Sequence, residues 1–301
     1  MKVLITGATG LVGSELVKLL LQNGVSVNYL TTSKNKLENQ DLYKGFYWNP
    51  NNGEIDRNAF DEVTAIIHLA GASIAQRWTA KNKQEIIESR VLPIRLLYNE
   101  LSKIDHSVQQ FISASAIGIY PHDFSKVYTE DESEIDNSFL GHVVAKWEDE
   151  TDTIGKLGIS VSKIRIGLVL SKNGGALQEF VKPIKFGFGA PFGTGKQYQS
   201  WIHIFDLANI FYFVLKEKLE GVYNAVSPYP ITNEDLTKAI AKQLEKPLLL
   251  PKIPKVAMKL VLGEMHYLLF VSQHVSARKI LDKKFQFKYP AIDKALQNLL
   301  A

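Results

Sequence analysis

Residues 1–13 read MKVLITGATGLVG, a short apolar run followed by three glycines at a spacing of three, Gly7, Gly10 and Gly13. Short apolar runs of this kind are typical of parallel strands that are covered on both faces. The next segment, Leu11–Asn23, places leucines at helical spacing and is followed by Gly24, a residue type that often ends helices. The sequence therefore predicts a buried strand, a tight glycine loop and a helix in immediate succession.

The three glycines have the spacing of a phosphate-binding loop. In such a loop the first glycine allows a tight turn, the second lets the backbone approach a pyrophosphate, and the third lets helix and strand pack closely. The helix that follows adds unpaired N–H groups and partial positive charge at its N-terminus. We therefore expect a dinucleotide to bind here, and a purely structural turn is the alternative. The predicted contacts are Gly7, Thr9, Gly10, Leu11 and Gly13.

Beyond the loop, apolar strand patterns alternate with helical patterns to about residue 170. Strands are expected at Val25–Leu30, Phe46–Trp48, Ala65–Ala70, Gln110–Ala114 and Val161–Leu168, and helices after Thr79 and at Phe139–Leu157. This alternation predicts an α/β fold with a Rossmann-type, doubly wound parallel sheet. We expect residues 1–170 to form this domain, with 206–228 returning to it. Residues 171–205 and 229–301 are expected to form a smaller, mostly helical C-terminal lobe that binds substrate.

The composition is that of an ordinary globular protein and excludes several classes of function. The chain has 301 residues, and its 35 Lys and Arg against 31 Asp and Glu give a net charge of only +4. This small excess of positive charge does not indicate binding to nucleic acid. The absence of cysteine excludes disulfides, thiolate zinc sites and a cysteine nucleophile. The seven histidines show no metal-ligand spacing, and no segment reads as membrane-spanning. We therefore expect a cytoplasmic protein without a metal site.

The end of the second predicted strand indicates which dinucleotide binds. NAD-binding proteins of this kind usually have an Asp or Glu about 20 residues after the glycine loop, which bonds the ribose 2′-hydroxyl. Here residues 30–36 read LTTSKNK, without a carboxylate. Hydroxyls and lysines suit a 2′-phosphate better, so we expect residues 1–170 to bind NADP(H). The alternative is that the lysines are only solvated charges on a loop. The predicted contacts are Thr31, Thr32, Ser33 and Lys34.

Further motifs point to one family. GATGLVG (7–13), HLAG (68–71) and SASA (113–116) together resemble the extended short-chain dehydrogenase/reductase superfamily. Further segments resemble an atypical subgroup of this superfamily. They are RWT (77–79), SRV (89–91), GIY (118–120), SWIHI (200–204), GVYNAV (221–226), LGEM (262–265) and FQFKYP (285–290). Members of that subgroup are usually labelled nucleoside-diphosphate-sugar epimerases and carry a C-terminal domain of unknown function. The resemblance covers essentially the whole chain and implies a cofactor site without an assigned reaction.

The resemblance also implies roles for particular residues. The three loop glycines would hold the pyrophosphate, and Arg90 would lie near the nicotinamide ribose. Further implied cofactor contacts are Leu69, Ala70 and Gly71, which would line the cofactor channel, and Ser113, Lys146 and Arg165. The subgroup commonly has an arginine where this chain has Thr32, and Lys34 could take its place.

The superfamily uses a Ser or Thr together with a Tyr and a Lys, the last two in a Y-x-x-x-K pattern on one helix face. The tyrosine exchanges a proton with the substrate while hydride passes to the nicotinamide, and the lysine lowers the pKa of the phenol. By this resemblance Ser115 and Lys146 are candidate catalytic residues, and His142 stands where the tyrosine is expected. His142 is either an alternative acid/base or an exposed histidine at a site that has lost standard catalysis. Tyr120 is another candidate for the missing group.

Arg77, Trp78 and Trp201 are the candidate substrate contacts, the arginine for an anionic group and the tryptophans for ring stacking. Each has a structural alternative, because tryptophans are often core residues and an arginine often forms a surface ion pair. The sequence thus predicts an NADP(H)-binding, oxidoreductase-like protein acting on a small carbonyl/alcohol or sugar-nucleotide substrate. A homodimer is one possible assembly. The alternative function is that of a non-catalytic NADP(H)-binding sensor or partner-binding protein.

Overall fold

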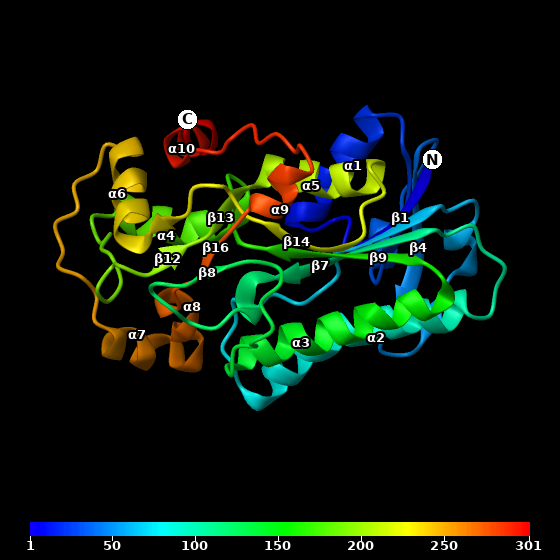
Figure 1. The fold of residues 1–301 in the computed structure, drawn as a ribbon, viewed down its shortest axis with the longest axis horizontal. Coiled ribbons are helices and arrows are strands. Elements are labelled where there is room, and N and C mark those ends of the chain that lie inside the picture. The colour runs from blue at the N-terminus through cyan, green and yellow to red at the C-terminus, as the bar shows by residue number, and fades with distance from the viewer.

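The computed structural model describes residues 1–301 and is built around one nine-stranded sheet (Figure 1). From one edge to the other the strands are β14 (Gly221–Ala225), β9 (Ser160–Ile166), β7 (Gln110–Ala116), β6 (Ala65–His68), β1 (Lys2–Thr6), β2 (Ser26–Thr31), β4 (Tyr43–Asn49) and β3 (Asn39–Gln40), and β5 (Glu54–Ile55) pairs with β4. All pairs from β14 to β4 are parallel, and only β3 and β5 are antiparallel to β4. The chain winds outward from β1 in both directions, which confirms the predicted doubly wound Rossmann-type sheet.

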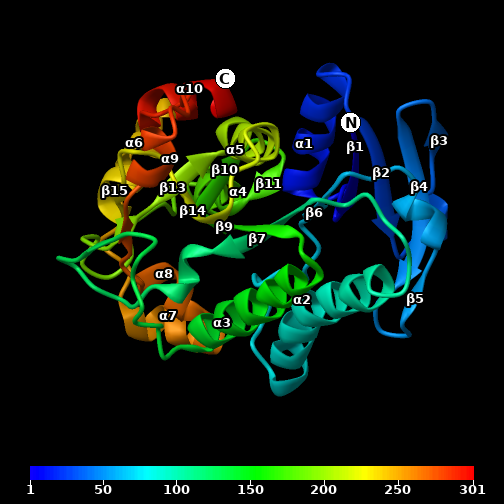
Figure 2. The same ribbon diagram turned by 45° about the vertical axis from the view of Figure 1, so that its right-hand side comes forward.

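Helices cover both faces of the sheet (Figure 2). On one face lie α1 (Leu11–Gln22) and α5 (Ile204–Lys216), and on the other α2 (Ala80–Leu101) and α3 (Phe139–Asp152). Because the central strands have helices on both sides, their side chains are buried in both directions, and all four residues of β6 are inaccessible. This double burial is the physical reason why the apolar runs in the sequence are continuous and not alternating.

Side-chain caps fix the starts of the two helices that lie near the carboxyl ends of the strands. The helix expected after Thr79 is α2, and the Thr79 hydroxyl accepts a hydrogen bond from the Asn82 amide at its start. The Ser138 hydroxyl does the same for the Gly141 amide at the start of α3. The predicted helix Phe139–Leu157 ends earlier than expected, because α3 gives way to a 3₁₀ helix over Thr153–Leu157.

The predicted strand Val161–Leu168 is two strands in two different sheets. β9 ends at Ile166, and β10 (Leu168–Ser171) pairs with β13 (Trp201–His203) and β11 (Gly174–Gly175). The break falls at Gly167, where a Cβ atom would lie 2.2 Å from the Ser200 carbonyl oxygen. This close approach allows only glycine and sends the chain from the main sheet into the C-terminal lobe.

The C-terminal lobe has its own apolar cluster, formed around α4 (Ala176–Lys185), α6 (Asn233–Gln243) and α10 (Ile292–Leu300). Short strands complete it: β12 (Tyr198–Gln199) pairs with β15 (Ile231–Thr232), and β16 (His274–Val275) pairs with β8 (Val127–Tyr128). Three short helices, α7 (Lys255–Leu262), α8 (Tyr267–Phe270) and α9 (Arg278–Asp282), lie between these elements. No helix has the length and apolar character needed to cross a bilayer.

Candidate functional site

The glycine loop joins β1 to α1 in a conformation that depends on its glycines. Gly7 has φ 73°, and a Cβ atom there would lie 2.8 Å from the Leu69 carbonyl carbon. A Cβ atom on Gly13 would lie 2.1 Å from the Gly7 oxygen. No side chain caps the N-terminus of α1, so the first amides of that helix remain available. The loop is therefore a cradle of backbone N–H groups that fits an anionic pyrophosphate.

A hollow of about 390 Å³ adjoins this loop at the ends of β1, β2 and β6. Of the residues predicted there, Gly7, Thr9, Gly10, Thr31, Thr32, Ala70 and Gly71 line it. The predicted contacts Leu11, Gly13, Ser33, Lys34 and Leu69 do not line it. The Lys34 ammonium is exposed and lies 5.0 Å from the centre of the Tyr47 ring. Residues 48–51, which are the last two residues of β4 and the two that follow it, also line the hollow. They were not predicted as contacts, because the apolar pattern of the expected strand Phe46–Trp48 does not show which residues beyond its carboxyl end meet a ligand.

The loop after β6 is held from beneath by two buried side chains. The Thr6 hydroxyl lies 2.7 Å from His68 Nδ1 and accepts hydrogen bonds from the amides of Leu69 and Ala70, each at 3.2 Å. His68 is completely buried, and this burial, with the nearby charge of Arg90, lowers its pKa to about 3. A neutral His68 therefore supports the wall of the cofactor channel rather than contacting a ligand.

Arg90 lies where the hollow meets a second cavity. Its guanidinium is 5.1 Å from the centre of the Trp147 ring, and Nη1 donates to the Ile86 carbonyl at 2.9 Å. A Cβ atom on Gly71 would lie 3.3 Å from Arg90 Cζ, so the channel glycine and the arginine are in contact. Arg90 forms no ion pair with any carboxylate, and burial lowers its pKa to about 10. Such an unpaired, half-buried cation fits an anionic or strongly polar ligand.

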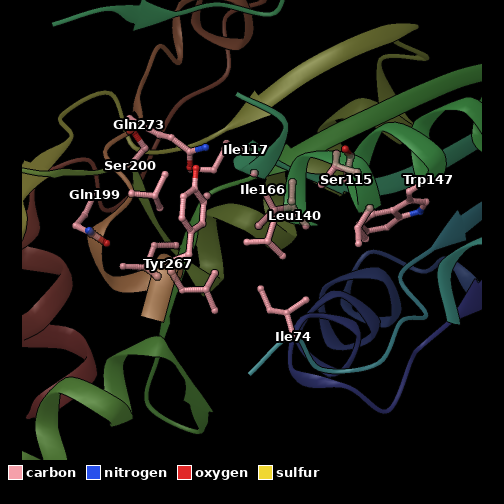
Figure 3. A pocket seen from close by; sticks show the side chains of 18 of the residues that line it. Ile74, Ser115, Ile117, Leu140, Trp147, Ile166, Gln199, Ser200, Tyr267 and Gln273 are labelled. Carbon is pink, nitrogen blue, oxygen red and sulfur yellow. The ribbon is translucent and has the colours of Figure 1, made fainter. Parts of the chain in front are cut away.

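The second cavity, of about 300 Å³, lies at the carboxyl ends of β7 and β9 (Figure 3). Ser115 and Trp147 lie at one end of the view, and Gln199, Ser200 and Gln273 at the other. The sheet and α3 form one wall, while the segments around β12, α8 and β16 form the opposite wall. Ligands in open α/β folds bind at this end of the strands.

Ser115 belongs to a buried polar network on the face of the sheet that packs against α3. Its hydroxyl donates to Glu148 Oε1 at 2.5 Å. Arg165 donates to both Glu148 oxygens, from Nε at 2.8 Å and from Nη2 at 2.9 Å. Ser115 and Arg165 are cross-strand partners, which is why the sequence brings them together. Burial alone would raise the pKa of Glu148, but the hydrogen bonds and charge of Arg165 outweigh it and hold that pKa below its usual value.

Three other predicted residues of the strands and their ends serve this network or the sheet, not the cavity. Arg165 is buried and its guanidinium is committed to Glu148 and to Tyr120, so it has no free face for a cofactor. Tyr120 accepts from Arg165 at 3.0 Å and donates to Asn224 at 2.7 Å, and burial raises its pKa to about 12. Ser113 is completely buried and donates to the carbonyl of Ala114.

The outer face of α3 carries His142 and Lys146, and both side chains are exposed. The inner face carries Leu140, Val144 and Trp147, which line the cavity. The structure therefore does not bring His142 or Lys146 to Ser115. The pairs four residues apart on α3 that do face the cavity are Leu140 with Val144 and Val143 with Trp147. The sequence does indicate which face of α3 is buried, since Leu140, Val143, Val144 and Trp147 recur at helical spacing on the face opposite His142 and Lys146.

The predicted substrate contacts are likewise separated. Trp78 is buried among Ile86, Leu140 and Val143, and its indole donates to the Ile74 carbonyl at 3.0 Å. Trp201 is completely buried in the C-terminal cluster and donates to the Tyr229 carbonyl. Both tryptophans are therefore core residues with satisfied N–H groups. Arg77 is exposed and does not line the cavity.

The C-terminal segment supplies cavity residues that the sequence analysis missed. Tyr267, Val271 and Gln273 line the cavity from this segment. The Tyr267 hydroxyl donates to Asp136 at 2.9 Å, and Gln273 donates to the Tyr120 carbonyl at 2.5 Å. These contacts join residues 131 and 153 positions apart, and no local pattern in the sequence marks them.

Comparisons with known proteins agree with this architecture. The model of the NAD dependent epimerase/dehydratase family matches residues 3–226, and a domain of unknown function, DUF1731, matches residues 253–299. The epimerase family protein YfhF of Bacillus subtilis (strain 168) is 33% identical over 302 residues, covering 100% of this chain and 98% of that protein. These matches confirm the resemblance seen in the motifs, including the uncharacterised C-terminal domain.

Two solved structures are similar over almost all of the chain. The human epimerase family protein SDR39U1 (isoform 2), solved with NADPH, aligns with a TM-score of 0.86 at 26% identity and covers 99% of both chains. The nucleoside-diphosphate sugar epimerase from Corynebacterium glutamicum aligns with a TM-score of 0.79 at 30% identity over 99% of this chain, which corresponds to 58% of that protein.

Proposed function

Because this chain belongs to the NAD dependent epimerase/dehydratase family, we propose that it is an NADP(H)-binding, oxidoreductase-like protein that holds a small molecule beside the nicotinamide. One observation carries the proposal: the phosphate-loop hollow and the cavity at Ser115 adjoin at the contact between Gly71 and Arg90. Together they follow the carboxyl ends of the parallel strands, as an extended dinucleotide and its reaction partner require.

The residues present fit the two ends of this cofactor. The glycine loop and the start of α1 would hold the pyrophosphate, and Thr31 and Thr32 would lie at the adenosine ribose. The absence of a carboxylate at the end of β2 favours a 2′-phosphate there, and the human relative solved with NADPH supports this choice. Arg90 would lie at the nicotinamide ribose. The bound cofactor would supply hydride chemistry to the cavity.

Ser115 is the polar group that this chain offers at the nicotinamide end of the cavity. Since its proton is donated to Glu148, its oxygen lone pairs remain to accept a hydrogen bond from a substrate hydroxyl. Arg165 keeps Glu148 ionised and thereby fixes the direction of this hydrogen bond. The arrangement positions an alcohol well, but it holds no tyrosine–lysine pair to move a proton. We therefore expect slow turnover.

Calorimetric titration with NADPH and NADH tests the cofactor assignment. NADPH should bind at least about tenfold more tightly, because its 2′-phosphate gains charge-assisted hydrogen bonds. Thr32→Glu should remove the preference, since it places a carboxylate directly after the end of β2, where the 2′-phosphate would lie. Lys34→Glu tells whether the exposed lysine reaches the phosphate in solution. Equal affinity of the wild-type protein for both cofactors would sink the NADP(H) assignment.

A second candidate function is NADP(H) binding without catalysis, as in a sensor. It is favoured by Leu140 and Val144, which give the inner face of α3 no acid or base. The two candidates separate in one assay, in which NADPH oxidation is followed with a panel of aldehydes and ketones. Turnover by the purified protein supports the oxidoreductase, and tight NADPH binding with no oxidation of any carbonyl supports the sensor.

A further inference from the structure

The walls of the cavity at Ser115 are mostly apolar. Of its 20 lining residues 13 are hydrophobic, and they come from the sheet, from α3 and from the C-terminal segment. In Figure 3 the side chains of Ile74, Leu140 and Ile166 lie between the two polar ends. A ligand that fills this space gains by covering apolar surface, at about 25 cal/mol per Å² removed from water.

Charge is nearly absent from the lining. Arg90 is the only charged side chain that faces the cavity. It lies against Trp147 and touches Gly71 of the cofactor channel, so it belongs to the end where NADP(H) would lie. A nucleoside diphosphate carries several negative charges, and an ionised phosphate placed against apolar walls without cationic partners is strongly disfavoured.

The polar groups of the lining are mostly occupied by the protein itself. Ser200 donates to the Gln273 carbonyl at 2.7 Å, and the Gln273 side chain donates to Tyr120. The side-chain amide of Gln199 and the hydroxyl of Tyr198, in contrast, form no hydrogen bond within the protein. A ligand therefore meets apolar walls and two kinds of polar group. The Ser115 oxygen at one end can accept from an alcohol, and the Gln199 amide and Tyr198 hydroxyl at the other can donate to an alcohol or carbonyl oxygen.

From these three observations we infer that the cavity takes an apolar, uncharged molecule with an alcohol or carbonyl oxygen, and not a nucleoside-diphosphate sugar. The inference rests on the proposed function, because it places this molecule beside the nicotinamide, and it specifies the substrate class of that same site. It separates this chain from the activity that the Corynebacterium glutamicum relative's name states.

Calorimetry with NADPH-saturated protein tests the inference with two probes, benzophenone as an apolar ketone and UDP-glucose as a sugar nucleotide. Benzophenone should bind, and UDP-glucose should neither bind nor displace it. Leu268→Gln, in the half-buried wall contributed by α8, should weaken benzophenone binding about tenfold by placing an amide against the apolar ligand. Leu140→Gln, in the opposite wall, should act in the same direction.

The matched control is Leu260→Gln on α7, whose side chain is 80% exposed and lies outside the cavity, and it should leave benzophenone affinity unchanged. Thermal melting and NADPH titration of each variant separate loss of the fold from loss of the cavity. Binding of UDP-glucose, failure of benzophenone to bind, or equal affinity in wild type and Leu268→Gln overturns the inference. Failure of NADPH to bind overturns the proposed function instead, so the two failures are distinguishable.

Discussion

At the scale of single residues, the site depends on groups that are expensive to bury and that are nevertheless buried. The side chains of Glu148 and Arg165 are 8% and 7% exposed, and each satisfies the other by two hydrogen bonds. A buried ion pair of this kind contributes little net stability, but breaking it leaves an uncompensated charge. Its structural value is that it fixes the direction of the Ser115 hydroxyl, which lines the cavity.

Glu148→Gln should therefore lower the free energy of unfolding by roughly 3–5 kcal/mol, because Arg165 then remains buried without its counter-charge. Glu150→Gln is the matched control on the same helix, since the Arg95 side chain that pairs with Glu150 is 54% exposed. The control should cost less than about 1 kcal/mol. Denaturant unfolding measures both. Equal losses in the two variants would contradict the cost of leaving Arg165 buried without its counter-charge.

Gly13→Ala should abolish tight NADPH binding while leaving the protein folded. The added methyl group would lie 2.1 Å from the Gly7 oxygen, and a backbone atom cannot move aside as a side chain can. The loop must therefore shift, and we expect at least about a tenfold loss of NADPH affinity. The control is Gly155→Ala in the 3₁₀ helix after α3, where the nearest atom is 3.9 Å away. Unchanged affinity in Gly13→Ala would show that this loop does not hold the pyrophosphate.

Burial of His68 predicts a loss of stability in mild acid. The folded protein holds the pKa of His68 at about 3, below the unfolded value of 6.5, so between these values the unfolded chain binds more protons. Unfolding free energy should accordingly fall as pH decreases through this window, by up to about 1.4 kcal/mol per pH unit for this proton. His68→Gln should flatten the dependence between pH 6 and 4 by roughly that slope. Parallel curves for the two proteins would argue against a neutral, buried His68.

At the scale of elements, the strands and helices could be predicted because their sequence patterns are local. The face of α3 that points to the cavity was predicted wrongly. The order of strands follows from the alternation of apolar runs and helices, and the cap at Thr79 follows from residue type. The spacing of Leu140, Val144 and Trp147 also indicates which face of α3 is buried. The catalytic pattern placed His142 and Lys146 on the face of α3 that points to the cavity, because it rests on the spacing of two residues and ignores the apolar residues of the helix.

His142→Ala should accordingly leave NADPH affinity, and any NADPH-dependent carbonyl reduction, within about twofold of wild type. The side chain lies in solvent on the outer face of α3 and meets neither the hollow nor the cavity. His142→Tyr should gain no activity for the same reason. Both variants can be measured by titration and by NADPH oxidation. A tenfold loss in His142→Ala would restore the histidine as an acid/base and refute the geometry described for α3.

At the scale of the whole molecule, the cavity exists only because the end of the chain returns to the sheet. β16 pairs with β8, and Lys83 on α2 donates to Glu264 across 181 residues of sequence. Contacts between positions so far apart leave no periodicity in the sequence, which is why Tyr267 and Gln273 could not be predicted as cavity residues. The fold of the main sheet could be predicted from residues 1–170 and 206–228, but the shape and chemistry of the cavity could not.

The wall formed by residues 255–270 should be the least stable part of the site, and ligands should stabilise it. Neither α7 nor α8 contains a buried residue, so these helices have little apolar burial to resist local opening. Amide hydrogen exchange here should be fast in the free protein. NADPH alone should slow exchange mainly in α1, whereas NADPH with benzophenone should also slow residues 255–270, roughly tenfold, because Tyr267 and Leu268 line the cavity.

Tyr267→Phe removes the hydrogen bond to Asp136 and should make residues 255–270 exchange faster and respond less to the second ligand. Tyr229→Phe is the control, since its side chain is 65% exposed and its hydroxyl makes no bond to the protein. Exchange in residues 255–270 that stays the same when both ligands bind would mean that this wall is rigid and that the cavity is formed before the ligand arrives. In that case the apolar molecule must enter through the opening that already exists, and Tyr267→Phe should leave its association rate unchanged.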